Sequence, residues 1–232
     1  MATKCEKEST CRISLNGFVT QNIKSRIVTE ILKYLLYHRE QIPLPFDQLY
    51  FQYQRPEINE ADHKHTLFKK RMTQLLKESQ ELFVNIDSLF QETDISHIIV
   101  LFGSTVISPK EVYHIRFLNN EQTSQTLSVK HCVRSVARSL ITSSPLGDSP
   151  LPPVTNMVLT AHAPRSCNPT WFKPKANFKV PKMGRHCNID ISCGMMHSRV
   201  SSEEHIWMQT PSGIKGLKDT VSPKAPSDLW CS

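Results

Sequence analysis

The chain has 232 residues, of which 39% are hydrophobic, and a formal net charge of +7, which suffices for the core of one domain of about 200 residues. No window of about 18 uncharged apolar residues occurs, and the charged start of the chain offers no apolar signal sequence, so we expect neither a membrane-spanning nor a secreted protein. The seven cysteines are odd in number and scattered, which favours a reducing, cytosolic or nuclear compartment.

Two amphipathic helices are predicted in the first 100 residues. Apolar residues recur at helical spacing from about residue 20 to 40, until Pro43 and Pro45 stop the pattern. A longer helix is predicted from about residue 62 to 91, with a wide apolar face opposite Lys and Glu residues. The width of that face predicts burial against a sheet or several helices.

The hydrophobic period then changes to that of strands. Residues 97–102 form a short apolar run that predicts a buried strand, and residues 112–117 alternate after a turn at Ser108 and Pro109. A third helix is predicted from about Ser124 to Ile141, with Leu127, Cys132, Val136 and Leu140 facing inward. Its outer face carries a basic stripe, Lys130, Arg134 and Arg138, which is either a contact surface or simply a solvated face.

The remainder of the chain reads as a loop followed by strands. Residues 143–153 contain four prolines and are predicted to form a surface connection. Strands are predicted at 154–162, 187–193 and 205–210, and the last ~16 residues lack periodicity. Three helices among at least five strands, without regular alternation, indicate an α+β fold in a single domain.

The positive charge is concentrated late in the chain. Residues 1–100 contain 13 Lys/Arg and 13 Asp/Glu, so the whole excess follows residue 100. The stretch from Arg165 to Arg185 contains six basic residues and no acidic one. Such a stretch is expected either to contact an acidic partner or to serve as a solvated basic loop.

Enzyme and metal motifs are absent from the sequence. Neither GxxxxGK[ST], GxGxxG nor GxSxG occurs, so we expect no enzyme and no nucleotide cofactor. His186, Cys187, Cys193 and His197 lie within twelve residues, but their irregular spacing favours buried thiols over a zinc site. Residues 171–175 (WFKPK) are of a type that can stack single-stranded nucleic acid, although packing of these rings on a sheet is the commoner arrangement.

Five segments resemble the comet protein family, whose members bind the mitotic-arrest-deficient HORMA checkpoint protein. In family order they are YHREQIPLPFDQL at 37–49, ISPKEVY at 107–113, WFKPKANFKVP at 171–181, ISCG at 191–194 and IWMQ at 206–209. The resemblance covers about residues 20–218. It implies a HORMA-like fold, with three main helices on a mostly antiparallel sheet, preceded by a partly ordered segment 1–19 and followed by a flexible tail 219–232.

The resemblance also implies a non-enzymatic adaptor that binds the closed form of the HORMA checkpoint protein. The family's partner surface is centred on the third predicted helix and the end of the first, which here correspond to His38, Lys130, Arg134, Ala137 and Arg138. Two of these depart from the family, which has a glutamine in place of His38 and a large aromatic residue in place of Ala137. The departures bear on the identity and affinity of the partner.

A second implied partner is the AAA+ ATPase that remodels HORMA proteins. The family segment offered to the ATPase corresponds to Pro174, Lys175 and Lys179, at the centre of the acid-free stretch. The implied outcome is disassembly of checkpoint complexes and checkpoint silencing, in the nucleus and cytoplasm with spindle or kinetochore association. The alternative from another class is a basic nucleic-acid-binding module, whose binding would fall steeply with salt.

Overall fold

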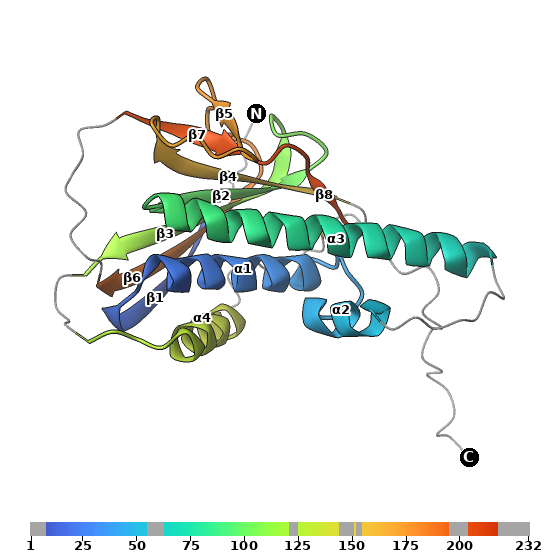
Figure 1. The fold of residues 1–232 in the computed structure, drawn as a ribbon, viewed down its shortest axis with the longest axis horizontal. Helices are drawn as coiled ribbons and strands as arrows, with labels where there is room; N and C mark the ends of the chain where they lie inside the picture. The colour runs from blue at the N-terminus through green and yellow to red at the C-terminus, as the bar shows by residue number, and fades with distance from the viewer. Residues whose placement is uncertain are drawn as a thin grey trace, which may run out of the picture.

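The computed structural model describes residues 8–54, 63–120, 125–143, 151, 155–194 and 204–217. Within these ranges the fold combines four helices with one sheet (Figure 1). The helices are α1 (Gln21–His38), α2 (Phe46–Gln54), α3 (His63–Glu92) and α4 (Val129–Ser143). The strands are β1 (Ser9–Phe18), β2 (His97–Gly103), β3 (Pro109–Asn119), β4 (Asn156–Pro164), β5 (Lys173–Lys175), β6 (Arg185–Gly194), β7 (His205–Gln209) and β8 (Ile214–Lys215).

The sheet has eight strands and mixed direction. Its order is β1-β6-β3-β2-β4-β7-β5, and β8 pairs with β4 beside this path. β6 runs parallel to both β1 and β3, whereas the other pairs are antiparallel. The α+β class is therefore confirmed, but the mostly antiparallel sheet is corrected to a mixed one. Side-chain alternation along a strand is the same in both directions, so the sequence pattern could not distinguish them.

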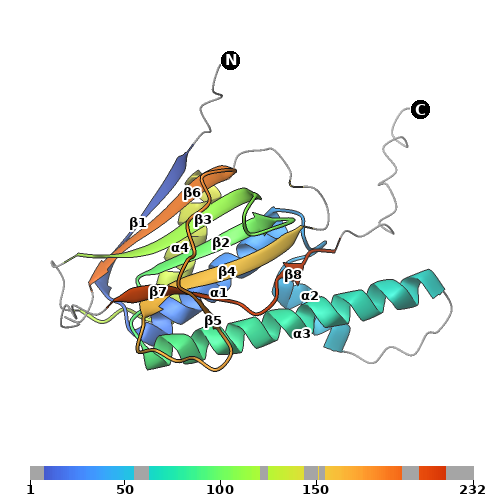
Figure 2. The same cartoon turned by 90° about the horizontal axis from the view of Figure 1, so that it is seen from above.

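The helices cover one face of the sheet, and no described helix covers the other, which we call the open face (Figure 2). α1 contacts both α3 and α4, and buries an unbroken apolar ridge that includes Ile27, Ile31 and Leu35. Its start is capped by Thr20, whose hydroxyl accepts a hydrogen bond from the backbone N–H of Ile23 at 3.4 Å. The predicted helices at 20–40 and 62–91 are thus confirmed as α1 and α3.

The structure corrects both the predicted count of three helices and the start of the third predicted helix. The prolines that end the first helical pattern also begin α2, because the carbonyl of Pro45 accepts from the N–H groups of Gln48 and Leu49 at 3.0 and 3.1 Å. Proline is well suited to a helix start, where its missing N–H has no helical partner to lose. The third predicted helix begins at Val129 instead of Ser124, since Gln125 and Leu127 hydrogen-bond with the backbone of Phe18.

The first described strand was not predicted from the sequence. β1 alternates buried Cys11, Ile13 and Leu15 with exposed residues, and pairs in parallel with β6 over Ser9–Ser14. Its alternation is visible in the sequence, but polar residues surround it and no turn signal marks its start. The predicted tail at 219–232 lies outside the described residues, as does most of the 143–153 loop.

Histidines form a row on the open face of the sheet. His114 lies between His97 and His186, with ring nitrogens separated by 3.3 and 3.2 Å. Burial, and then the neighbouring histidine, lowers the pKa of both His97 and His114 to about 4. Arg116 lowers both pKa values further, whereas Asp190 opposes the shift. Both rings are therefore neutral in the folded protein at neutral pH.

This row predicts a loss of stability on acidification. The folded pKa values lie below the unfolded value of about 6.5, so the unfolded state binds more protons as the pH falls from 6.5 toward 4. We expect the free energy of unfolding to fall by about 1–2 kcal/mol between pH 7 and pH 5, after allowance for partial exposure. Urea titrations at several pH values measure this, and His97→Gln with His114→Gln should flatten the dependence. An equal slope in the double variant would assign the loss to other groups.

Candidate functional site

An apolar groove lies between α1, the start of α2 and α4. Its volume is about 210 Å³. α1 contributes Ile27, Ile31, Tyr34 and Tyr37, α2 begins at Phe46 on its border, and α4 contributes Val133, Val136, Ala137 and Leu140. Charged side chains, Glu30, Lys33 and Asp47, stand at one rim, where Lys33 pairs with both carboxylates at 3.0 and 2.8 Å.

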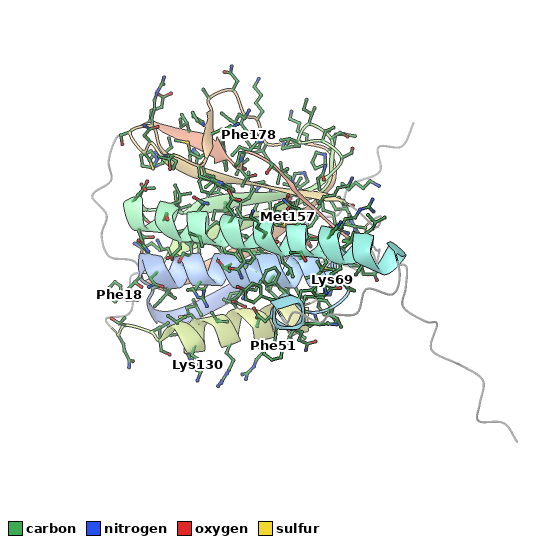
Figure 3. All side chains as sticks on the ribbon, turned by 45° about the vertical axis from the view of Figure 1, so that its right-hand side comes forward. Phe18, Phe51, Lys69, Lys130, Met157 and Phe178 are labelled. Carbon is green, nitrogen blue, oxygen red and sulfur yellow. The ribbon has the colours of Figure 1, made fainter. Side chains whose placement is uncertain are left out.

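The predicted basic stripe of α4 stands beside this groove. Cys132, Val136 and Leu140 are buried as predicted, whereas Leu127, also predicted to face inward, precedes α4 and is half-buried. Lys130, Arg134 and Arg138 are exposed. Figure 3 shows Lys130 projecting outward from α4. Ala137 lines the groove, so the small side chain at this position lies where two helices meet. The structure thus brings Ala137 together with the basic residues on one surface.

His38 joins the same surface through Tyr34. It is the last residue of α1, is exposed, and its ring centroid lies 5.1 Å from that of Tyr34, which lines the groove. Tyr37, which lines the groove, is 45% exposed, and Leu44 and Phe51, just before and within α2, are 40% and 63% exposed. Phe51 could not be predicted as a surface residue because its helix, α2, was not predicted. An apolar residue on the outer side of a short helix would have indicated it.

A buried ionic network fixes the end of α1 next to His38. Arg39 donates through Nε to a carboxylate oxygen of Glu111 at 2.9 Å, and the side chains of both residues are at most 3% exposed. Glu111 also accepts from the Tyr113 hydroxyl and from Arg185 at the start of β6. Burial and the Glu111 carboxylate raise the pKa of Tyr113, so its hydroxyl remains a donor. The network ties α1 to β3 and β6.

Pro174 and Lys175 of the predicted ATPase segment lie in β5, which forms the edge of the sheet at the other end from β1. Within the described residues β5 pairs with β7 alone, which places Pro174 opposite Met208, and all three side chains of β5 are exposed. Proline is tolerated on an edge strand because its missing N–H removes no ladder bond there. Lys179 is exposed as well.

In an extended chain Lys175 and Lys179, at positions i and i+4, would face the same side, but the chain turns between them. The N–H of Phe178 donates to the carbonyl of Lys175 at 3.0 Å, which closes a turn at Ala176 and Asn177. The two lysines therefore lie on either side of a turn, and after it the chain crosses the open face of the sheet toward β6 (Figure 2). In Figure 1, α4 and α2, which border the groove, lie on the opposite side of the molecule from β5.

The remaining chemical groups are used in packing. Cys187 and Cys193 are buried, as the interpretation of buried thiols predicted, and burial raises the pKa of each to about 11. Among the described residues, which exclude His197, no group of three or more His, Cys, Asp and Glu could hold a metal ion.

The Trp171 indole donates to Glu81 at 2.8 Å and packs edge-on against Phe172, so its ring is engaged within the fold. No helix in the described ranges is long and apolar enough to cross a membrane.

Comparisons with known proteins give one consistent result. The family model described as "p31comet: Mad1 and Cdc20-bound-Mad2 binding" matches residues 2–219. The chain is 28% identical over 225 residues to the MAD2L1-binding protein of Homo sapiens, covering 93% of this chain and 82% of the human protein. It is 28% identical over 212 residues to the MAD2L1-binding protein of Mus musculus, covering 88% and 77%. A family match over nearly the whole chain shows membership, and the chain belongs to the p31comet family.

Proposed function

We propose that this chain is an adaptor with a HORMA-like fold that binds a closed mitotic-arrest-deficient HORMA protein through the α1–α4 groove. The observation that carries the proposal is that Ala137 lines one apolar groove together with Tyr34 and Tyr37 near the end of α1, while the basic stripe is exposed on the same helix as Ala137. These elements correspond to the partner surface of the family, and two relatives are named for binding MAD2L1. Support for the HORMA-like fold comes from the family match and the α+β architecture.

The groove fits a partner with an apolar ridge and acidic residues beside it. Its walls are aliphatic and aromatic side chains, whose burial contributes about 25 cal/mol per Å² of apolar surface removed from water. The exposed Lys130, Arg134 and Arg138 stand on the same helix and would meet carboxylates at the rim. Apolar contact then supplies affinity, and the charges favour one orientation of the partner.

Two substitutions on α4 test the location of this interface. Ala137→Phe should tighten HORMA binding by several-fold, because it adds an aromatic side chain at a small-residue position in the groove. Arg134→Glu should weaken binding, mainly through a slower association, because it reverses a charge at the rim. Calorimetry on folded proteins measures both affinities. Unchanged affinity in both variants would move the interface elsewhere.

We propose further that the turn after β5 docks to an AAA+ ATPase, in which ATP hydrolysis takes place. Support comes from the exposure of Pro174, Lys175 and Lys179 on an edge strand and its turn. The same residues lie in a stretch without acidic side chains. A turn closed by a hydrogen bond presents its lysines at low ordering cost. Location on the side opposite the groove would let both partners bind at once.

Replacing Lys175 and Lys179 with Ala should abolish ATPase-driven conversion of the HORMA client. The fold and HORMA binding should remain, because exposed lysines contribute less than about 0.5 kcal/mol to stability. A conversion assay with the wild-type and doubly substituted adaptors measures the effect, with HORMA binding determined in parallel. Full conversion by the double variant would eliminate the segment as the docking site, and loss of both activities would indicate misfolding.

The biological consequence of the proposal is disassembly of checkpoint complexes and silencing of the spindle checkpoint. The adaptor would then act in the nucleus and cytoplasm and at the spindle or kinetochores in mitosis. Fluorescence imaging of the tagged chain in dividing cells tests the location. Depletion should prolong mitotic arrest, and a chain carrying Lys175→Ala and Lys179→Ala should fail to restore timely exit.

A further inference from the structure

Two loops meet at one end of the sheet, where β3 and β6 begin. β3 and β6 are parallel neighbours, with Glu111 opposite Arg185, so the residues that precede them emerge together. A Cβ placed on Gly184 would lie 2.8 Å from the carbonyl oxygen of Pro109. Gly184 has a φ of 98°, a conformation that favours glycine, and its lack of a Cβ allows the two loops to approach this closely. Met183 accordingly lies beside the loop 104–108 that joins β2 to β3.

Both loops are held in place by packing on the open face of the sheet. Val106 from one loop, and Phe178 and Val180 from the other, pack against a small cluster formed by Ile99, Leu101 and Val112. The β2–β3 loop is also closed by a hydrogen bond from the Ser108 N–H to the Thr105 hydroxyl at 3.2 Å. Val106, Phe178 and Val180 are thereby partly buried, and their packing anchors both loops on the sheet.

Ile107 and Met183 point outward from these anchored loops. Ile107 is 87% exposed, the largest exposed fraction among the large hydrophobic residues of the described chain, and Met183 is 60% exposed. Single exposed apolar residues are common on protein surfaces, but apolar residues from two neighbouring loops at one end of the sheet are more typical of a contact surface.

The two chain segments that carry this pair are basic. Lys110, Lys179 and Lys182 are exposed, and residues 104–110 and 165–185 include no Asp or Glu. The next carboxylate along the chain, Glu111, is buried and already bound by Arg39 and Arg185. These two segments therefore carry a net positive charge, which is the charge distribution expected of a surface that meets carboxylates.

We propose that Ile107 and Met183, with Lys110 and Lys182 around them, bind an apolar pocket bordered by carboxylates on a protein partner. We call these four residues the loop-end surface. The proposal rests on the proposed ATPase docking, because Lys179 and the β5–β6 connection link the loop-end surface to Lys175, and it extends that contact from the turn to the end of the sheet. Two aliphatic side chains among lysines match a protein pocket better than nucleic acid, which is recognised chiefly through phosphates and aromatic stacking.

The test is titration of the full chain with the ATPase held in its ATP-bound state. Ile107→Ser with Met183→Ser should weaken binding at least ten-fold, whereas Leu118→Ser, a matched change of a residue 43% exposed at the far end of β3, should have no effect. HORMA binding and the melting temperature should be unchanged in both variants. Full ATPase affinity in the Ile107/Met183 variant would overturn the proposal.

Parallel titrations separate this proposal from the docking that it extends. If the Lys175/Lys179 double variant binds the ATPase normally, the proposed docking site fails. If that variant loses binding while the Ile107/Met183 variant retains it, the docking site stands and the loop-end surface is excluded. Vesicles of phosphatidylcholine and phosphatidylserine and an unrelated single-stranded oligonucleotide serve as competing probes. Tighter binding to either than to the ATPase, lost in the Ile107/Met183 variant, would also overturn the proposal.

Discussion

Glu111→Gln is expected to lower the free energy of unfolding by about 3–5 kcal/mol, because it removes the carboxylate charge that pairs with the buried guanidinium of Arg39. Arg39 is 2% exposed, so water cannot replace the lost carboxylate. The substitution preserves side-chain volume, and the loss therefore reports charge and hydrogen bonding instead of a cavity. Urea denaturation followed by circular dichroism measures the change.

A surface ion pair supplies the matched control for this prediction. Nη1 of Arg165 lies 2.7 Å from Oε2 of Glu204, but the two side chains are 62% and 67% exposed. Glu204→Gln should cost less than about 1 kcal/mol, because exposed pairs are screened by solvent. Equal effects of the two substitutions would show that the Arg39 network contributes no more than a surface pair.

Long periodic segments of the fold could be predicted from the sequence, and short or partly polar ones could not. α1 and α3 have apolar faces that persist over many turns, and β2 is a continuous apolar run, so each pattern outweighs local exceptions. α2 has only nine residues and begins directly after two prolines that read as a stop signal. β1 is recognisable as a strand mainly through its pairing with β6, which is distant in sequence.

The residues of the candidate site could be predicted from the sequence, but the groove between α1 and α4 could not. The resemblance indicated His38, Ala137 and the basic stripe, and the exposure of Arg134 and its neighbours follows from helical periodicity. The groove itself depends on the packing of α1 against α4, which periodicity does not specify. The turn between Lys175 and Lys179 was missed because no glycine marks it, and WFKPKANFKVP reads as extended chain.

Ala137→Glu is expected to weaken HORMA binding by at least about 100-fold, or about 2.7 kcal/mol. A carboxylate at this position would lie among the apolar side chains of the groove and would have to lose its hydration when the partner binds. Placing a charge of the same sign on Val84, which is 63% exposed on α3 and does not line the groove, should leave the affinity unchanged.

The most direct test of the adaptor account is calorimetric titration of the closed mitotic-arrest-deficient HORMA protein with three chains: wild type, Ala137→Glu and Val84→Glu. The account predicts saturable binding by the wild type and by Val84→Glu, and loss of binding by Ala137→Glu with an unchanged melting temperature. No binding by the folded wild-type chain, or equal affinity of all three chains, would contradict it.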